Sequence, residues 1–275
     1  MAGVSENTIS KFILDLGTVC FDHEDQALRG LLCERIQADE IWAFCYAKDR
    51  NLPPSMKDEP GVGSIWTWTA VCADTKLLIS WLMGKRDKDH ADGFRRDLSS
   101  RIAVRPQLTT DALGLYAKAV SDAFGARGID YAVVHKEYAG EVSDEGRYSP
   151  PRCIAVTKKR VYGKPFKVDA TTSHVERQNL TIRMSQRRWT RLTNGYSKSF
   201  SHMECAFAIH AFWYNWIRRH SSLKGKTPAM ANDLASHPWT FEEMIGLLEA
   251  KERAAVAAGK LKRGSYRPRK PKNSN

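Results

Sequence analysis

Residues 36–47 read IQADEIWAFCYA, residues 66–74 read WTWTAVCAD, and residues 76–83 read KLLISWLM. β-Branched and aromatic residues dominate all three stretches, which is typical of strands. Only a tight turn at Asp74-Thr75 separates the second stretch from the third. The sequence therefore predicts three consecutive strands, the last two of which are joined by this turn.

Downstream of these strands the periodicity alternates. The pattern predicts a helix over 90–102, a strand over 104–110, a helix over 115–124 and a strand over 131–138. Three strands followed by alternating helix and strand favour an α/β protein with a mixed sheet between helices. Residues 139–172 break the pattern with proline, glycine and charge, and we expect an insertion that carries a small ribbon, IAVTKKRVYG.

Helical spacing of apolar residues extends to both ends of the chain. At the start it predicts a helix over 5–16 that stops at Gly17 and a second helical stretch over 24–34. After the insertion the predicted helices cover 174–193, 202–218, 228–235 and 240–258. We expect residues 1–34 to be an N-terminal helical segment, 35–220 the α/β core with its insertion, 221–258 C-terminal helices and 259–275 a tail.

Composition narrows the class of protein. The sequence contains no run of eighteen apolar residues, so we expect no membrane span. Its N-terminus lacks the positively charged segment followed by an apolar stretch that marks a secretory signal. The six cysteines form no C-x-x-C pair, which disfavours a disulfide framework or a zinc knuckle. Lys and Arg outnumber Asp and Glu by 43 to 31, for a net charge of +12. This excess indicates a polyanionic partner such as nucleic acid. We expect a cytoplasmic, nucleoid-associated protein.

The C-terminal residues 259–275, GKLKRGSYRPRKPKNSN, carry seven basic and no acidic residues. Such a segment cannot bury enough apolar surface to fold alone, so we expect a disordered tail. Its composition fits a solubilising tail and a nucleic-acid-binding arm equally well.

Three acids occupy positions where chemistry is common. Asp39 lies in the first strand on the same face as Ile41, because side chains alternate along a strand. Asp111 ends the fourth strand, and Glu176 begins the helix predicted over 174–193. If the first and fourth strands are neighbours, the three acids converge at one edge of the sheet, beyond the strand ends where α/β proteins bind ligands.

Each acid also has a purely structural interpretation. Asp111 could be a helix N-cap, Asp39 could pair with an arginine, and Glu176 follows Ser173 by three residues, as in a capping box. As a set around a phosphodiester, however, the three carboxylates suggest two-metal catalysis. Hard oxygen ligands suit two Mg²⁺ ions, for which Mn²⁺ can substitute.

Basic residues follow Glu176 along the same predicted helix. Arg183, Arg187 and Arg191 are spaced so that they form one stripe on a helix, with Arg188 beside it. A solvated face normally mixes charge signs, whereas these arginines fit phosphate-backbone binding. Lys158 and Lys159 in the ribbon and Arg218 near the C-terminus are further DNA-contact candidates, although a solvated hairpin and helix packing explain them as well.

Five stretches resemble one known family. They are QADEIWAFCYAKDRN (37–51), WTWTAVCADTKL (66–77), QLTTDALGLY (107–116), HVERQNLTIRMSQRRWTRLTNGYSKS (174–199) and YNWIRRHSSLKGKTPAMA (214–231). In this order they resemble DDE transposases of the insertion-sequence-one family, and the last stretch more loosely resembles integrase-like cores. The resemblance covers residues 3–245.

The resemblance implies a ribonuclease H-like fold with a five-stranded mixed sheet. It implies that Asp39, Asp111 and Glu176 are the catalytic, metal-binding acids and that Arg183 is the basic residue two helical turns after the glutamate. Ala112 replaces the glycine that the family usually has after the second aspartate. The expected activity is metal-dependent cleavage of double-stranded DNA at element ends and transfer of the 3′-hydroxyl to target DNA, by a homo-oligomer.

Two other functions fit the same residues. One is a ribonuclease H-like, structure-selective nuclease, and the other is a non-catalytic DNA-binding regulator or transposase relic. Residues 5–16 resemble only the last helix of a helix-turn-helix and carry a single basic residue, Lys11. We therefore expect DNA binding that depends steeply on salt and is nearly sequence-blind, unless another module reads the element ends.

Overall fold

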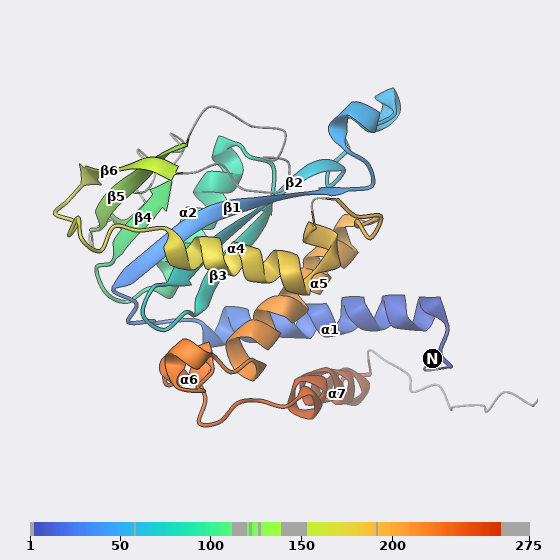
Figure 1. Cartoon of the computed structure of the whole chain (residues 1–275). Coiled ribbons are helices and arrows are strands. Elements are labelled where there is room, and N and C mark those ends of the chain that lie inside the picture. The colour runs from blue at the N-terminus through green and yellow to red at the C-terminus, as the bar shows by residue number, and fades with distance from the viewer. Residues whose placement is uncertain are drawn as a thin grey trace, which may run out of the picture.

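The computed structural model contains a mixed six-stranded sheet flanked by helices (Figure 1). It describes residues 3–57, 59–111, 120, 123–125, 128–138, 153–190 and 192–259. The strand order is β3-β2-β1-β4-β5-β6. The strands are β1 (Arg35–Cys45), β2 (Gly63–Cys72), β3 (Leu78–Gly84), β4 (Gln107–Asp111), β5 (Asp130–Tyr138) and β6 (Cys153–Tyr162).

The sheet confirms the predicted strands and adds one. β1, β2 and β3 pair antiparallel in sequence, whereas β4 pairs parallel with β1 and β5 parallel with β4. The prediction of five strands was wrong, because the ribbon expected within the insertion is a sixth strand, β6, paired antiparallel with β5. This pairing satisfies backbone groups that β5 would otherwise expose at the sheet edge. The α/β architecture is compatible with a ribonuclease H-like fold.

Helices cover both faces of the sheet. They are α1 (Glu6–Ala27), α2 (Lys88–Arg101), α4 (Ser173–Ser185), α5 (Phe200–Phe212), α6 (Pro228–Ala231) and α7 (Phe241–Ala257), and a π-helical turn over Trp213–Ile217 extends α5. Among the described helices, none has the length and apolar character that crossing a membrane requires. The predicted helix over 115–124 lies largely outside the described residues; residues 139–152 of the insertion, Ala112, Arg191 and tail residues 260–275 lie wholly outside them.

Alternation along β1 divides its side chains between two apolar cores. Ile36 and Ala38 pack in the core that includes Phe94 of α2. Ile41 and Ala43 pack in a second core that includes Val175 of α4. Asp39 has the same parity as Ile41, so the alternation turns it toward the face that α4 covers.

The N-terminal helix is longer than predicted. α1 is one continuous helix of 22 residues that passes through Gly17, where the sequence predicted a stop, and it ends before residues 28–34. A Cβ atom on Gly17 would lie 2.3 Å from Cβ and 2.6 Å from Cα of Cys205 in α5. The glycine therefore permits the close crossing of α1 and α5, rather than ending a helix. The helix predicted over 228–235 is shorter than expected, since α6 ends at Ala231.

This crossing gives a test in which two glycine substitutions have opposite effects. Gly17→Ala should lower the free energy of unfolding by about 1–3 kcal/mol, because the added methyl group overlaps the α5 backbone. Gly246→Ala in α7 meets no atom within 4 Å and should raise it by about 0.5–1 kcal/mol, the usual helix-propensity gain. Urea denaturation measures both. Stabilisation by Gly17→Ala would contradict the close crossing.

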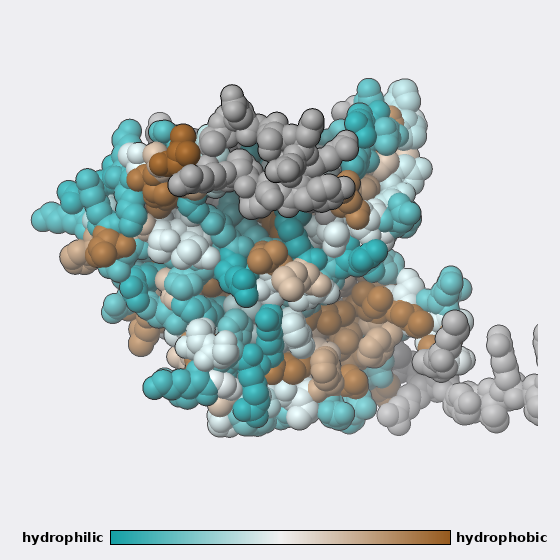
Figure 2. All heavy atoms as spheres, viewed as in Figure 1, coloured by the Kyte–Doolittle hydropathy of each residue, from teal (hydrophilic) through white to brown (hydrophobic). Residues whose placement is uncertain are grey.

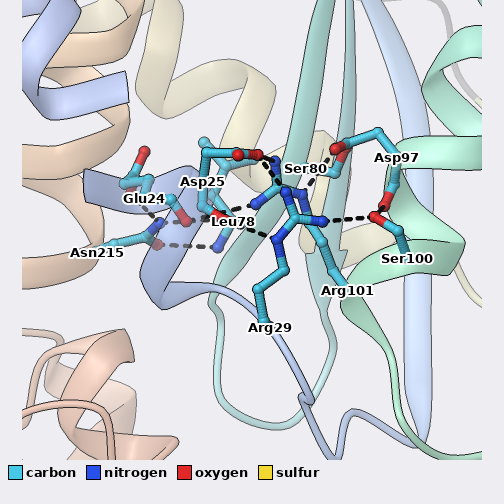
Figure 3. A network of polar contacts seen from close by, with 9 residues as sticks. All are labelled: Glu24, Asp25, Arg29, Leu78, Ser80, Asp97, Ser100, Arg101 and Asn215. Carbon is cyan, nitrogen blue, oxygen red and sulfur yellow. Dashed lines mark hydrogen bonds and ion pairs between the residues drawn. The ribbon is translucent and has the colours of Figure 1, made fainter. Parts of the chain in front are cut away.

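A polar network fastens α1 to β3 and to the π-helical turn (Figure 3). The amide nitrogen of Asn215 donates to Oε1 of Glu24 at 2.7 Å and to the carbonyl of Leu78 at 3.0 Å, and its amide oxygen accepts from the Leu78 N–H at 2.9 Å. Glu24 is 4% exposed, and burial raises the pKa of its carboxyl group to about 8, despite the opposing hydrogen bond from Asn215. Glu24 is therefore protonated in the folded protein at neutral pH.

The same network reaches α2 through a buried arginine. Arg101 donates to Asp97 at 2.7 Å and to Asp25 at 2.8 Å, while Ser80 of β3 donates to Asp97 at 2.5 Å (Figure 3). Arg101 is only 6% exposed, so both carboxylates compensate a charge that is largely removed from water. Four elements, namely α1, β3, α2 and the π-helical turn, are thus joined by one set of hydrogen bonds.

Glu24 should make stability depend on pH. The folded protein holds a proton on Glu24 that the unfolded chain releases above its ordinary pKa of 4.5, so stability should fall as pH rises from about 5 to 8. Glu24→Gln should flatten this dependence and leave the protein at least as stable at pH 8.5, because the amide can still accept from Asn215. Urea midpoints across pH 5–9 measure the effect. The exposed Glu252→Gln serves as control, and an unchanged slope in Glu24→Gln would disprove the assignment.

Candidate metal centre

Two of the predicted acids lie side by side on adjacent strands. In the parallel pairing of β1 with β4, Ala38 is opposite Thr110, and the next step along both strands brings Asp39 beside Asp111. Parallel neighbours in register point their side chains to the same face. The sheet pairing alone therefore brings these two carboxylates together.

A third carboxylate, which the sequence reasoning missed, completes a cluster. One carboxylate oxygen each of Asp39, Glu40 and Asp111 lies within 4.8 Å of the other two. Glu40 is 8% exposed, and its carboxylate accepts from the Arg86 guanidinium at 3.2 Å. Strict strand alternation would place Glu40 on the opposite face from Asp39. The only sequence signal for its participation was that it directly follows Asp39.

Glu176 lines the same pocket as Asp39 and Asp111, a cavity of about 230 Å³. It lies in the first turn of α4, where its carboxylate accepts from the Thr172 hydroxyl at 2.6 Å and forms an ion pair with Lys136 of β5. The capping-box alternative is wrong: the N-cap is Thr172, and its side chain makes no cap bond to the backbone. The structure thus gathers all three predicted acids at one pocket.

Burial and neighbouring negative charges shift the pKa of Asp39 upward. Burial, followed by the charges of Glu40 and Asp111, raises the pKa of its carboxyl group to about 7, and the more distant Glu176 adds to this. Hydrogen bonds from the Glu40 N–H and from the Asn179 amide, both at 2.8 Å, hold the two oxygens in place. Near neutral pH, a positive charge added to the pocket would therefore stabilise it by relieving the repulsion among the carboxylates.

The donor set fits a hard divalent cation. The cluster offers only carboxylate oxygens, which Mg²⁺, Mn²⁺ and Ca²⁺ favour over the soft and imidazole ligands of zinc sites. The three oxygens lie within 4.8 Å of one another, so small side-chain rotations suffice to bring them to the distance of about 2.0–2.1 Å at which Mg²⁺ binds its ligands. The acidic cluster could therefore bind a metal ion.

The arginines do not form the predicted stripe. The helix predicted over 174–193 ends at Ser185, and Gln186 is extended, with φ −120° and ψ 103°. Trp189 causes the break: it is 1% exposed and donates from its indole to Thr67 at 3.1 Å. Arg183 donates to the carbonyl of Trp189 at 2.9 Å and so fastens the chain after the break.

The remaining basic candidates are dispersed. Arg187 follows the break and lines a large pocket of about 590 Å³ with Lys48 and Arg50. Arg188 donates to Ser197 at 3.4 Å, and Arg191 lies outside the described residues. On β6, Lys158 donates to the carbonyls of Lys167 and Val168, whereas Lys159 is exposed; Arg218 lines a different pocket, on the other side of α4.

Repulsion among the carboxylates should appear in thermal stability. At pH 8, where Asp39 is ionised, Asp111→Asn should raise the stability of the metal-free protein by about 1 kcal/mol, equivalent to roughly one pKa unit of repulsion. Mg²⁺ or Mn²⁺ should raise the melting temperature of the wild type, and much less that of the variant.

The exposed acid Asp89 supplies the matched control for this experiment. Asp89→Asn should keep the full response to the metal ion. An equal response to metal in Asp111→Asn and the wild type would place the metal elsewhere.

Comparisons with known proteins give little further information. Neither the models of known protein families nor the sequences of curated proteins match the chain. Among solved structures, the chain is similar to one described as a piggyBac transposase synaptic complex with hairpin DNA. The match has 12% sequence identity and a TM-score of 0.31 and covers 84% of this chain. The chain spans only 56% of the length of that transposase chain, and a likeness this weak does not place it in a family.

Proposed function

We propose that this protein is a DDE-type transposase of the insertion-sequence-one kind, with a ribonuclease H-like core that cleaves DNA and transfers the 3′-hydroxyl end to target DNA. The observation that carries the proposal is the acidic pocket, where Asp39 and Asp111 meet on parallel strands and Glu176 lines the same cavity. Two-metal phosphodiester chemistry uses such oxygen ligands to hold its divalent ions, and the sequence motifs around each acid resemble that family.

In this proposal the carboxylates of Asp39, Asp111 and Glu176 hold two Mg²⁺ ions, or Mn²⁺ in their place. The ions would activate the attacking oxygen and stabilise the leaving oxygen. Glu40, buried against Arg86, keeps negative charge beside Asp39 and raises the attraction of the pocket for cations. The Asn179 amide donates to one oxygen of Asp39 and so holds that oxygen in one orientation.

Basic side chains around the pocket supply the DNA-binding surface. Lys136 and Lys159 lie on the two strands beside the acidic pocket, and Arg187 lies beyond the far end of α4. These cations would contact phosphates and give affinity without sequence information. Because the chain leaves the helix at Gln186, the arginines do not lie along one line. The bound DNA would therefore contact more than one side of α4.

We also propose that the protein acts as a homo-oligomer on DNA. Val4, Ile9 and Phe12 of the N-terminal region are 53%, 47% and 42% exposed, and Figure 2 shows apolar surface gathered around this end of α1. Exposed apolar patches of this kind often mark protein–protein contacts. A second copy of the chain is the partner that a transposase acting on two element ends would need.

A structure-selective nuclease and a non-catalytic DNA-binding regulator use parts of the same surface. The nuclease would nick DNA without joining it, whereas the transposase yields joined products in a strand-transfer assay. The regulator would bind DNA without either reaction. The crowded acids favour an enzyme, because a protein that only binds phosphate would gain affinity by losing them.

Substitutions should separate catalysis from binding. Asp111→Asn should abolish metal-dependent cleavage and strand transfer and leave DNA affinity equal or higher, because one negative charge near the phosphates is removed. Arg187→Ala should instead weaken binding to all sequences and lower the slope of log affinity against log salt by about one. Gel assays with Mg²⁺ and anisotropy titrations measure these effects. Full strand transfer by Asp111→Asn would refute the assignment.

A further inference from the structure

A second polar pocket lies on the other flank of α4 from the acidic pocket. Its volume is about 500 Å³, which is within the range of small-molecule sites. Residues of α4, of the turn after β2 and of the segment after α5 line it. Arg177 and Gln178 of α4 belong to this pocket, whereas the adjacent Glu176 belongs to the acidic one.

The rim of this pocket carries uncompensated positive charge. Arg177, Arg218 and Arg219 line it, and among the described residues none of the three forms an ion pair with a carboxylate. Lys76 also lines it and donates to the Ala73 carbonyl and to His174. None of the described lining side chains is acidic. Three unpaired guanidinium groups around one cavity are suited to a phosphate group.

The wall of the pocket contains a buried amide that has no partner. Gln178 is 2% exposed, and neither its amide oxygen nor its amide nitrogen has a hydrogen-bond partner among the described residues. Nε2 of His220, which also lines the pocket, is likewise buried without a partner. Leaving such atoms unsatisfied costs free energy. A donor and an acceptor side by side on one amide match the edge of a nucleobase.

We propose that this pocket binds one unpaired nucleotide, with its phosphate at the arginines and its base edge at the Gln178 amide. The pocket is much larger than a lone phosphate needs, and Tyr214 adds an aromatic wall. Burial and the charge of Arg218 lower the pKa of His220 to about 4, so its ring is neutral at pH 7 and accepts as well as donates hydrogen bonds. The arginines, the Gln178 amide and the aromatic wall together match a nucleotide taken out of a duplex.

This inference rests on the proposed function for the source of the nucleotide. A helix with its side chains is about 10–12 Å across, so α4 separates the two pockets by only a few nucleotides of strand. A strand with its phosphodiester at the acidic pocket could therefore place a neighbouring, unpaired base in the second pocket. A free mononucleotide would use the same contacts, and the experiment distinguishes the two sources.

The test uses fluorescence anisotropy with the full chain and three duplexes of equal length. One is fully paired, one has a single bulged adenine, and one has an abasic bulge that retains the phosphate. The wild type should bind the adenine bulge at least about tenfold more tightly than either other duplex. Gln178→Met has no amide and should reduce this preference to about one, while its melting temperature stays equal or rises because no unsatisfied polar atom remains.

Controls identify each alternative. Gln26→Met, on the exposed surface of α1, should keep the preference. Equal preference in Gln178→Met and the wild type, or no preference in the wild type, would overturn the proposal. Binding of deoxyadenosine monophosphate that depends on Gln178, without preference for bulged DNA, would overturn the DNA source and show a mononucleotide site. Cleavage is measured separately, with paired DNA and with Asp111→Asn for comparison. A failure of the proposed enzyme function can therefore be distinguished from a failure of nucleotide binding in the second pocket.

Discussion

Parallel pairing of β1 with β4 is the interaction on which the candidate site depends. It fixes Asp39 beside Asp111 by backbone hydrogen bonds alone, so the two acids cannot move apart without breaking the sheet. The cost is electrostatic, and it is visible in the pKa of Asp39, which burial and its acidic neighbours raise to about 7. The two apolar cores, one on each face of the sheet, stabilise the arrangement against this repulsion. A rigid scaffold holding like charges together is what cation-dependent chemistry requires.

The sequence predicted the sheet well because its strands are strongly patterned. β1, β2 and β3 lie within a few residues of their predicted bounds, and the Asp74-Thr75 turn connects β2 to β3. The errors came from contacts between distant residues. Gly17 resembled a helix stop, but its missing side chain makes room for Cys205. The helix expected to reach residue 193 ends at Ser185, since Trp189 is drawn into the core and its indole bonds Thr67.

The site was predicted in part for the same reason. Alternation and strand ends pointed to Asp39 and Asp111, and the start of a helix pointed to Glu176. Alternation equally argued against Glu40, whose carboxylate nevertheless approaches the cluster with Arg86 beside it. The second pocket had no local signal, because Gln178, Arg218 and Lys76 come from three separate segments that only the tertiary fold brings together. Pocket walls assembled in this way do not leave a periodic trace in the sequence.

The ion pair between Lys136 and Glu176 has a consequence for how many cations the pocket can hold. Above the pKa of Asp39, four carboxylates face two fixed cations, Lys136 and Arg86, so two negative charges remain uncompensated. A single divalent ion brings the pocket to neutrality. Under the proposed function, a second ion would be balanced only when a phosphodiester brings further negative charge. Charge balance would then impose an order of assembly, in which the second ion binds together with the nucleic acid.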